Sequence, residues 1–254
     1  MSQSLFSRWR RDDHGVYPAP APERPFIAVG DIHGRLDLLD KLHDVVTDVP
    51  RDWPAVFVGD YIDRGDNSAG VLARLCAPRS AFVRDVVFLR GNHEDMLLSF
   101  LDRPEEAGPR WLRHGGMQTL ASFGLDLSTA PRTPEDYGKV RDGLIAALGT
   151  ERIAWLNGCP PRWSSGAVHV VHAGADPRTA VEAQSAQTMI WGHPDFASAR
   201  RADGAWIVHG HTIVEAPAAV EGRIPIDTGA FATGRLTAAL IQPDGKVEFR
   251  QTQA

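Results

Sequence analysis

Residues 55–65 read AVFVGDYIDRG, so that a short apolar run ends at a glycine and passes directly into acidic and basic side chains. The apolar part is short and contains β-branched and aromatic residues, which predicts a buried strand. The same arrangement recurs in FIAVGDIHG at 26–34 and in VVFLRGNHE at 86–94. These three stretches therefore predict three strands, each followed by a polar turn.

Helical patterns separate the three predicted strands. Apolar residues recur at helical intervals within 36–46, and a second group of this kind lies within 71–75. An alternation of strand and helix predicts parallel neighbouring strands, because each helix returns the chain to the same end of the sheet. The first part of the chain therefore predicts an α/β fold with a parallel core sheet.

The later part of the chain predicts further strands with a more antiparallel arrangement. Pro243-Asp244-Gly245 is typical of a hairpin turn. Between the two parts, residues from about 95 to 160 contain helix-like segments and no convincing strand, which predicts a helical insertion over one edge. The later apolar runs are VHVV at 168–171, WIVHG at 206–210, IPID at 224–227 and LTAALI at 236–241.

Composition excludes several classes of protein. The 254 residues include 27 Lys and Arg against 32 Asp and Glu, and the net charge of −5 argues against a wholly basic nucleic-acid-binding protein. No apolar run approaches the roughly 20 residues that a membrane-spanning helix needs. Cys76 and Cys159 are far apart and suggest neither a disulfide framework nor a zinc cluster. We therefore expect a cytoplasmic protein.

The N-terminal segment differs from the rest. Residues 1–25 combine arginines with a proline-rich end and lack the apolar core of a signal peptide. We expect residues 1–25 to be a flexible tail and residues 26–254 to form one domain that carries the helical insertion.

Polar clusters follow five of the predicted strands. In open α/β sheets, ligands bind beyond the carboxyl ends of strands, so these clusters should converge on one crevice. Bringing Asp31 and Asp60 together without a cation would leave their repulsion unrelieved. Two divalent ions about 3.5–4 Å apart, bridged by one carboxylate, would relieve it. The clusters are GDIHG at 30–34, GDYIDRG at 59–65, GNHE at 91–94, HAG at 172–174 and HGHT at 209–212.

The motifs GDIHG, GDYIDRG, RGNHE, HAG and GHT, in this order, resemble those of the calcineurin-type metallophosphoesterases. The full strings GDYIDRG and RGNHE resemble most closely the phosphoprotein phosphatase branch, which includes phage lambda phosphatase and bacterial serine/threonine phosphatases. The resemblance covers roughly residues 26–240. It implies an α/β fold of four layers, an αββα sandwich with a helical insertion and with metals at the strand ends.

The resemblance also implies two metal sites that share a ligand. Related nucleases and phosphodiesterases usually have a second histidine where this chain has Ile213, which favours the phosphatase branch. The expected cofactor is a pair of divalent ions, with manganese as first choice and iron and zinc as alternatives, because such ligands suit several metals. The implied ligands are Asp31, His33 and Asp60 for the first ion, and Asp60 as the bridge with Asn92, His172 and His211 for the second.

Four further residues have roles in the mechanism that the resemblance implies. Hydroxide activated by the two metals would attack phosphorus in line, and His93 would protonate the leaving oxygen. Asp63 would bond the other ring nitrogen of His93, while Arg64 and Arg90 would grip the phosphate. We expect Glu94 to be structural, at the start of a helix.

Some positions depart from the family pattern or have no implied chemistry. Where bacterial relatives carry an arginine after Trp191, this chain has Gly192-His193, and Arg200 and Arg201 are candidates to replace the charge. We expect His209 to support the site rather than to bind metal. The stretch WLRHGGMQTLASFG at 111–124 resembles the insertion of the bacterial and phage enzymes, which lies over the cleft.

The expected function is metal-dependent hydrolysis of phosphomonoesters, as a serine/threonine protein phosphatase. A nucleotide hydrolase similar to the symmetric diadenosine tetraphosphatases is the alternative. A metal-stabilised scaffold is a third interpretation, but a scaffold could discard His93 and both arginines while keeping its metals. The expected partner is a phosphorylated protein or a small phosphoester, with no nucleic acid and no membrane; the oligomeric state stays open.

Overall fold

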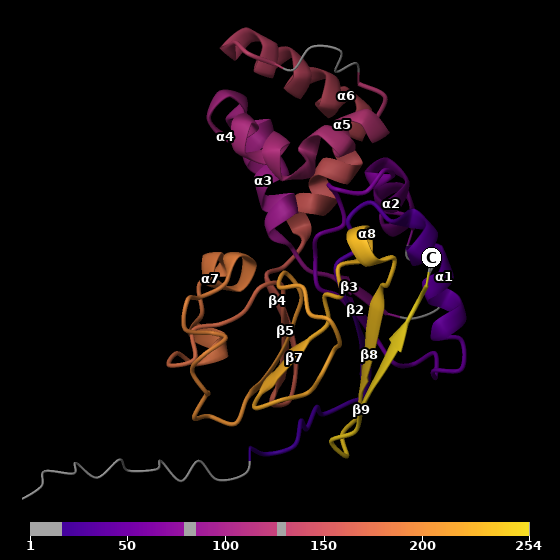
Figure 1. Cartoon of the computed structure of the whole chain (residues 1–254), viewed down its shortest axis with the longest axis vertical. Coiled ribbons are helices and arrows are strands. Elements are labelled where there is room, and N and C mark those ends of the chain that lie inside the picture. Colours follow the sequence, from indigo (N-terminus) through magenta and orange to yellow (C-terminus); the bar gives the residue numbers. More distant parts are fainter. Residues whose placement is uncertain (1–16, 79–84, 126–130, 254) are drawn as a thin grey trace, which may run out of the picture.

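Two β-sheets lie face to face at the centre of the molecule (Figure 1). The computed structural model describes residues 17–78, 85–125 and 131–253. The first sheet has the order β3-β2-β1-β8-β9, and the second has the order β4-β5-β6-β7. The strands are β1 (Phe26–Val29), β2 (Ala55–Phe57), β3 (Val86–Phe88), β4 (Arg162–Ser165), β5 (Val168–Val171), β6 (Trp206–His209), β7 (Arg223–Pro225), β8 (Thr237–Ile241) and β9 (Val247–Gln251).

Parallel pairing connects the strands that carry the motifs. In the first sheet β1, β2 and β3 are parallel, as the helical patterns between them predict, whereas β8 and β9 are antiparallel. In the second sheet β5, β6 and β7 are parallel and only β4 is antiparallel. The predicted hairpin turn joins β8 to β9, and Gly245 in it has a φ of 87°. The second sheet is therefore more parallel than the sequence pattern indicates.

Helices cover the outer faces of both sheets. Each helix has apolar residues on one side, and it packs on a sheet because this side is then buried. Helices α1 and α2 pack on the first sheet, and α7 and the 3-10 turn η3 pack on the second. They span α1 (Leu36–Val45), α2 (Ser68–Leu75), η3 (Val181–Ala183) and α7 (Ala186–Trp191), while the short α8 (Ala230–Thr233) precedes β8.

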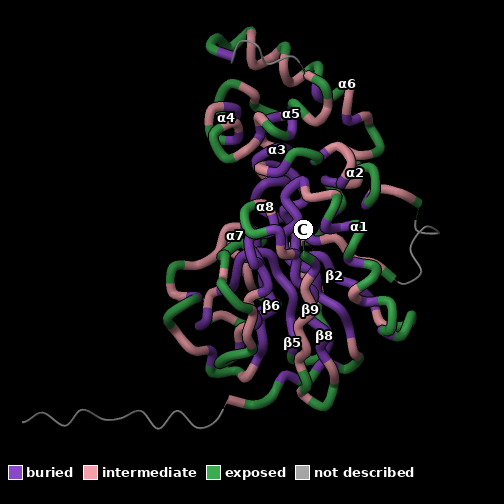
Figure 2. The backbone as a smooth tube through the Cα atoms, turned by 45° about the vertical axis from the view of Figure 1, so that its right-hand side comes forward, coloured by how far each residue is buried: buried purple, intermediate pink, exposed green. Residues whose placement is uncertain are grey.

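Three apolar interfaces separate four layers. Alternate residues of a strand point to opposite faces, so Val29 packs with the helices α1 and α2, while Ala28 packs between the sheets. On the other side of the second sheet, Ile207 packs with Met189 of α7. Figure 2 shows the buried strands between more exposed helices and loops. The αββα sandwich is confirmed.

The helical insertion stands beyond one end of the sheets (Figure 1). It begins immediately after β3, and Gly149, with a φ of 75°, bends its longest helix. No described helix is long and apolar enough to cross a membrane. The insertion comprises α3 (Asn92–Asp102), α4 (Pro104–Trp111), the π-helical turn η2 (Leu112–Gly116), α5 (Met117–Ser122) and α6 (Pro134–Gly158).

Two features are not indicated by the sequence. Strand β4 lies at a sheet edge and is partly exposed, so it lacks the apolar run that marks the other strands. Two residues of the expected flexible tail contact the second sheet, since the Tyr17 hydroxyl donates to the Ala205 carbonyl at 2.7 Å and Trp206 Nε1 donates to the Pro18 carbonyl at 2.8 Å. The boundary at residue 25 therefore stays a prediction, although Tyr17 and Pro18 contact the second sheet; residues 1–16 lie outside the described part of the chain.

Candidate metal centre

The side chain of Asp60, directly after β2, lies at the centre of the converging strand ends. His33 follows β1, and its Nε2 is 3.5 Å from Asp60 Oδ2. His172 follows β5 in the second sheet, and its Nε2 is 3.4 Å from Asp60 Oδ1. The loops of both sheets therefore meet at one carboxylate, as the strand-end argument predicts.

Two groups of potential metal-binding atoms share Asp60. One group is His33, Asp60 and His93, and the other is Asp60, His172 and His211; within each, the candidate atoms lie within 4.8 Å of one another. The Asn92 Oδ1 atom is 2.8 Å from His172 Nε2 and 2.7 Å from His211 Nδ1. Oxygen and imidazole nitrogen in this arrangement form a suitable donor set for divalent ions.

The ring nitrogens of two histidines are oriented for binding a cation. His33 Nδ1 is 2.9 Å from the Ile62 carbonyl, and His172 Nδ1 is 3.1 Å from the Val58 carbonyl. A carbonyl only accepts, so each Nδ1 carries the proton and the Nε2 of each neutral ring presents its lone pair to the centre. In His172 this lone pair faces Asn92 Oδ1 at 2.8 Å, so two acceptor atoms meet there, an arrangement that a cation between them would relieve. Burial lowers the pKa of His33 to about 3 and that of His172 to about 4, which keeps both rings neutral.

The carboxylate of Asp31 supports the same assignment. Its Oδ2 accepts from the His211 backbone N–H at 3.0 Å, but its buried Oδ1 has no hydrogen-bond partner. Burial, Asp227 and Asp60 together raise the pKa of Asp31 well above its ordinary range. An unpartnered buried oxygen among carboxylates is costly unless a cation compensates it, so these residues fit a pair of divalent ions.

Backbone strain is concentrated in these loops. Non-glycine residues rarely adopt positive φ, and such strain persists where surrounding contacts hold it. Among the described residues, five of the six non-glycine positions with positive φ belong to the expected site: His33, Asp60, Asp63, Arg64 and His211.

Gly210 allows the HGHT loop to approach Asp31. A Cβ atom at this position would lie 1.9 Å from Asp31 Oδ1 and 2.8 Å from Val58 Cγ2. Gly210→Ala should therefore displace Asp31 and weaken manganese binding by about 10–100-fold, as measured by calorimetric titration. Gly138→Ala is the matched control, because a Cβ there meets open space. Unchanged manganese affinity in Gly210→Ala would contradict this account.

His93 lies beside the potential metal-binding groups and is tied to Asp63. Its Nδ1 is 2.6 Å from Asp63 Oδ2, and its Nε2 is 3.8 Å from Asp60 Oδ2. Burial lowers the pKa of His93, but the charge of Asp60 and the hydrogen bond and charge of Asp63 outweigh it, so the pKa is raised. The ring thus has one nitrogen fixed by Asp63 and the other directed toward the centre.

The two arginines of the expected site lie in different environments. The guanidinium of Arg64 is 4.8 Å from the centroid of the Phe231 ring, beside a cavity of about 600 Å³ that both residues line. The Arg90 Nη2 atom donates to the Asn157 carbonyl at 2.6 Å, and the buried Nε has no hydrogen-bond partner. The phosphate-binding role of Arg90 stays a prediction.

Glu94 has the structural environment that we expected at the start of α3. Its carboxylate accepts from the backbone N–H groups of Asp60 and Tyr61, each at 2.8 Å, and of Gly91 at 2.9 Å. These bonds connect the loop after β2 to the loop after β3. His209 contacts the Phe196 ring and lies outside both groups of potential metal-binding atoms.

Three residues of the site have no assigned role in the sequence-based prediction. Asp227 is buried beside Asp31, and burial raises its pKa to about 6. Trp111 and Thr119, from the insertion, donate hydrogen bonds to Asp63. The motif string IDTGA, residues 226–230, follows a short strand and could have drawn attention to Asp227 by the same strand-end argument.

The candidates for a replacement charge near Trp191 are engaged elsewhere. Arg201 is buried, and its guanidinium pairs with Asp203. The guanidinium of Arg200 lies over the Tyr17 ring, 4.9 Å from its centroid. Arg110 of α4 instead lies 4.3 Å from the Trp191 ring centroid.

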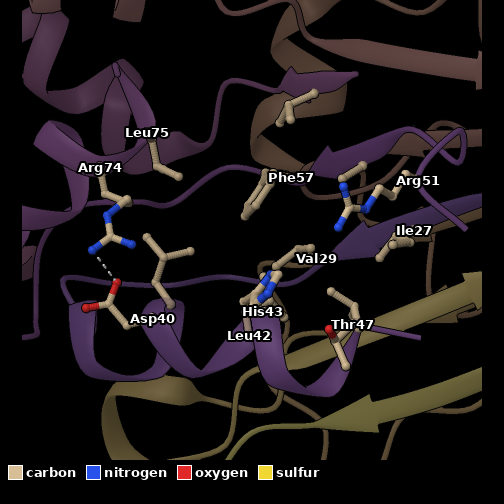
Figure 3. A pocket seen from close by; sticks show the side chains of 14 residues that line it. Ile27, Val29, Asp40, Leu42, His43, Thr47, Arg51, Phe57, Arg74 and Leu75 are labelled. Carbon is tan, nitrogen blue, oxygen red and sulfur yellow. Dashed lines mark ion pairs between the residues drawn. The ribbon is translucent and has the colours of Figure 1, made fainter. Parts of the chain in front are cut away.

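A separate cavity of about 300 Å³ lies between α1 and the first sheet (Figure 3). Its wall is mainly apolar, with Val29 and Phe57 on the strands and the Asp40–Arg74 ion pair at one side. None of the potential metal-binding residues lines it.

Comparison with known proteins agrees with the motifs and their geometry. Residues 24–215 match the model of the calcineurin-like phosphoesterase family. The chain belongs to this family. As a calcineurin-like phosphoesterase it is a metal-dependent hydrolase, and the residues around Asp60 are candidates for its metal ligands.

Two relatives of this phosphoesterase match over most of both chains. Serine/threonine-protein phosphatase 1 of Salmonella typhimurium is 31% identical over 222 residues, which cover 84% of this chain and 90% of that protein. The asymmetrical bis(5'-nucleosyl)-tetraphosphatase PrpE of Bacillus velezensis is 31% identical over 232 residues, which cover 82% and 86%. Three other curated relatives are much longer, and the matched segments span between 12% and 20% of their lengths.

The fold also occurs in solved structures. The cold-active protein-tyrosine phosphatase of a psychrophilic Shewanella species superposes with a TM-score of 0.57 at 18% identity, over 89% of this chain and 80% of that chain. This likeness concerns the fold alone.

Proposed function

We propose that this phosphoesterase hydrolyses phosphomonoesters and acts on phosphoserine and phosphothreonine in proteins. The observation that supports this most is the buried His93–Asp63 pair, whose ring nitrogen faces the centre 3.8 Å from Asp60 Oδ2. Hydrolysis of a monoester with an alkoxide leaving group requires a proton donor close to the leaving oxygen, and His93 Nε2 faces the centre where the phosphate would bind. The extensive match to a bacterial serine/threonine-protein phosphatase supports the same substrate class.

The proposed metal ligands divide into two sets. Divalent ions bound there, with manganese as first choice, would lower the pKa of water and offset the charge of the phosphoryl group. We assign Asp31, His33 and Asp60 to one ion, and Asp60, Asn92, His172 and His211 to the other, which leaves His93 of the first group of potential metal-binding atoms as the proton donor.

The remaining residues would bind and protonate the substrate. Arg64 would hold the phosphoryl oxygens, because it follows Asp63 directly and its guanidinium has no carboxylate partner among the described residues. We assign Arg90 to the same task, with part of its guanidinium engaged by carbonyls of α6. His93 Nε2 would give its proton to the leaving oxygen as the ester bond to phosphorus breaks, and Asp63 would stabilise the positive ring before that transfer.

A nucleotide substrate is the second candidate. It is supported by the match to an asymmetrical bis(5'-nucleosyl)-tetraphosphatase over 82% of this chain. A panel of phosphoserine, phosphothreonine and phosphotyrosine peptides beside diadenosine tetraphosphate separates the candidates by kcat/KM. Preference for the dinucleotide by about tenfold, or about 1.4 kcal/mol in transition-state stabilisation, would favour the nucleotide hydrolase.

The choice between monoester and diester is tested first. Protein stripped of metal and reloaded with manganese should hydrolyse p-nitrophenyl phosphate about 100-fold faster than bis(p-nitrophenyl) phosphate, because the arginines and cations complement a dianion better than a monoanion. The measurement is kcat/KM for both substrates, with metal-free protein as control. A preference for the diester would reject the monoesterase proposal.

A further inference from the structure

The carboxylate of Asp63 receives most of its hydrogen bonds from the helical insertion. Trp111 Nε1 is 3.0 Å from Asp63 Oδ2 and 3.2 Å from Oδ1, and the Thr119 hydroxyl donates to Oδ1 at 2.6 Å. The third partner is His93 of α3, whose Nδ1 is 2.6 Å from Oδ2. All four side chains are at most 1% exposed, so water does not replace these bonds.

Thr119 also holds the backbone of Asp63. The Asp63 N–H points to Thr119 Oγ1 at 2.9 Å and to Ser68 Oγ at 3.0 Å. Asp63 has a φ of 71°, a strained conformation that such contacts stabilise. One threonine thus accepts from the backbone of Asp63 and donates to its side chain, which restricts both φ and the orientation of the carboxylate.

The insertion is closely packed at this point. The Trp111 ring lies 4.8 Å from the Phe100 ring, and a Cβ on Gly116 would lie 2.6 Å from Trp111 Cδ2. In the π-helical turn η2, between Trp111 and Thr119, Gly115 has a φ of 110° and its carbonyl accepts from the Arg64 N–H at 3.4 Å. Packed aromatic rings and a tight turn therefore fix the two donors against the loop after β2.

We propose that Trp111 and Thr119 are positioning residues, which hold Asp63 so that His93 presents its Nε2 proton to the leaving oxygen. This inference rests on the proposed phosphomonoesterase function. In the step, hydroxide, formed from a water that has released its proton to solvent, makes the new bond to phosphorus while the ester P–O bond breaks. The leaving oxygen takes the proton from His93 Nε2, and the ring regains a proton from solvent before the next turnover. Trp111 and Thr119 exchange no proton; they act through Asp63 alone. The insertion then contributes, through Trp111 and Thr119, to the position of the proton donor His93.

A pair of variants at Thr119 tests the role of its hydroxyl. Thr119→Val keeps the volume and removes the donor, so kcat for phenyl phosphate, a poor leaving group, should fall about 10–100-fold. For p-nitrophenyl phosphate the change should be much smaller, because that leaving group needs little protonation. KM should stay close to wild type, and Thr119→Ser should recover most of the lost activity. Equal losses on both substrates would indicate a merely structural role and overturn the proposal.

Trp111→Phe tests the indole donor. The phenyl ring keeps an aromatic contact with Phe100. It removes the N–H together with part of the buried ring volume, so the selective loss on phenyl phosphate should recur beside some loss of stability. Trp206→Phe is the matched control, because it removes an indole hydrogen bond of 2.8 Å to Pro18 and leaves Asp63 untouched. A loss on phenyl phosphate in Trp206→Phe as large as in Trp111→Phe would contradict the assignment.

A double-mutant cycle tests whether Thr119 acts through Asp63. In an Asp63→Ala background, Thr119→Val should have almost no further effect on kcat, because the group that it positions is gone. A loss in that background as large as in the wild type would overturn the proposal.

A measurement without turnover separates this inference from the proposed function. The His93 Nδ1 proton, donated to Asp63, should give a downfield proton resonance in the metal-free protein, absent in His93→Ala. In Thr119→Val this proton should shift and exchange faster with solvent; an unchanged resonance would overturn the positioning role. If the wild type hydrolyses no monoester but the resonance still responds to Thr119→Val, the proposed function fails while the positioning of His93 stands.

Discussion

Replacing His93 with alanine should lower kcat for phenyl phosphate by about 10²–10⁴-fold, the range that a general acid supplies. The loss for p-nitrophenyl phosphate should be smaller, since its leaving group is a weak base. Two manganese ions should remain bound by elemental analysis. The physical reason is the position of the ring, with Nδ1 bonded to Asp63 at 2.6 Å and Nε2 free to give its proton.

His43→Ala is the matched control for this experiment. His43 is exposed on α1 and lines the separate apolar cavity, so its loss should leave the rates unchanged. If His93→Ala lost one manganese ion, His93 would belong to the ligands, as its place beside His33 and Asp60 would also allow. The division between acid and ligand would then be wrong.

Replacing Asp60 with asparagine should abolish binding of both ions and reduce turnover to near the background rate. Asp60 Oδ1 and Oδ2 face His172 and His33 respectively, so a single carboxylate serves both groups. An amide has no negative charge and only one acceptor oxygen, and it cannot bridge two cations. The affinity for manganese should fall by more than the about 10–100-fold typical of losing a residue that merely supports a ligand.

The control for this variant is Asp44→Asn, which removes a carboxylate that is exposed on α1. Manganese stoichiometry by elemental analysis and the manganese-induced rise in Tm provide two readouts. Wild-type stoichiometry in Asp60→Asn would reject a bridging carboxylate at this position. Loss of a single ion would show that the two groups do not share Asp60.

Much of the fold could be predicted because its signals are local. Apolar runs of three to five residues mark β1, β2, β3, β5, β6 and β8, and helical spacing between the first three requires parallel pairing. Strand β4 escaped prediction because an edge strand with one exposed side needs no apolar run. The contact of Tyr17 with the second sheet could not be predicted, because the sequence of a proline-rich segment does not indicate which surface of the domain it contacts.

Some contacts of the candidate site could likewise be predicted from the sequence, and others could not. His33, Asp60 and Asn92 could be placed together because the loops after neighbouring parallel strands must meet at one sheet edge. Asp227 follows the edge strand β7 of the other sheet, and only the packing of the two sheets brings it beside Asp31. The residues next to Trp111 and Thr119 in the sequence indicate only helices. Their contact with Asp63 depends on how the insertion packs against the loop after β2.

The amino-acid sequence by itself determined which chemistry this phosphoesterase carries: carboxylates, an amide and imidazoles placed directly after strands, with glycines that let the backbone turn. These are local properties, because a strand and the turn that ends it are specified by adjacent residues. The strand-end argument predicted that His172 and His211 come near Asp60, but tertiary structure alone decided that they do so from a second sheet and that Asp63 is held by the insertion. Those contacts join residues far apart in the chain, and they form because the apolar interfaces between the layers can be buried in one arrangement that also brings the polar strand ends together.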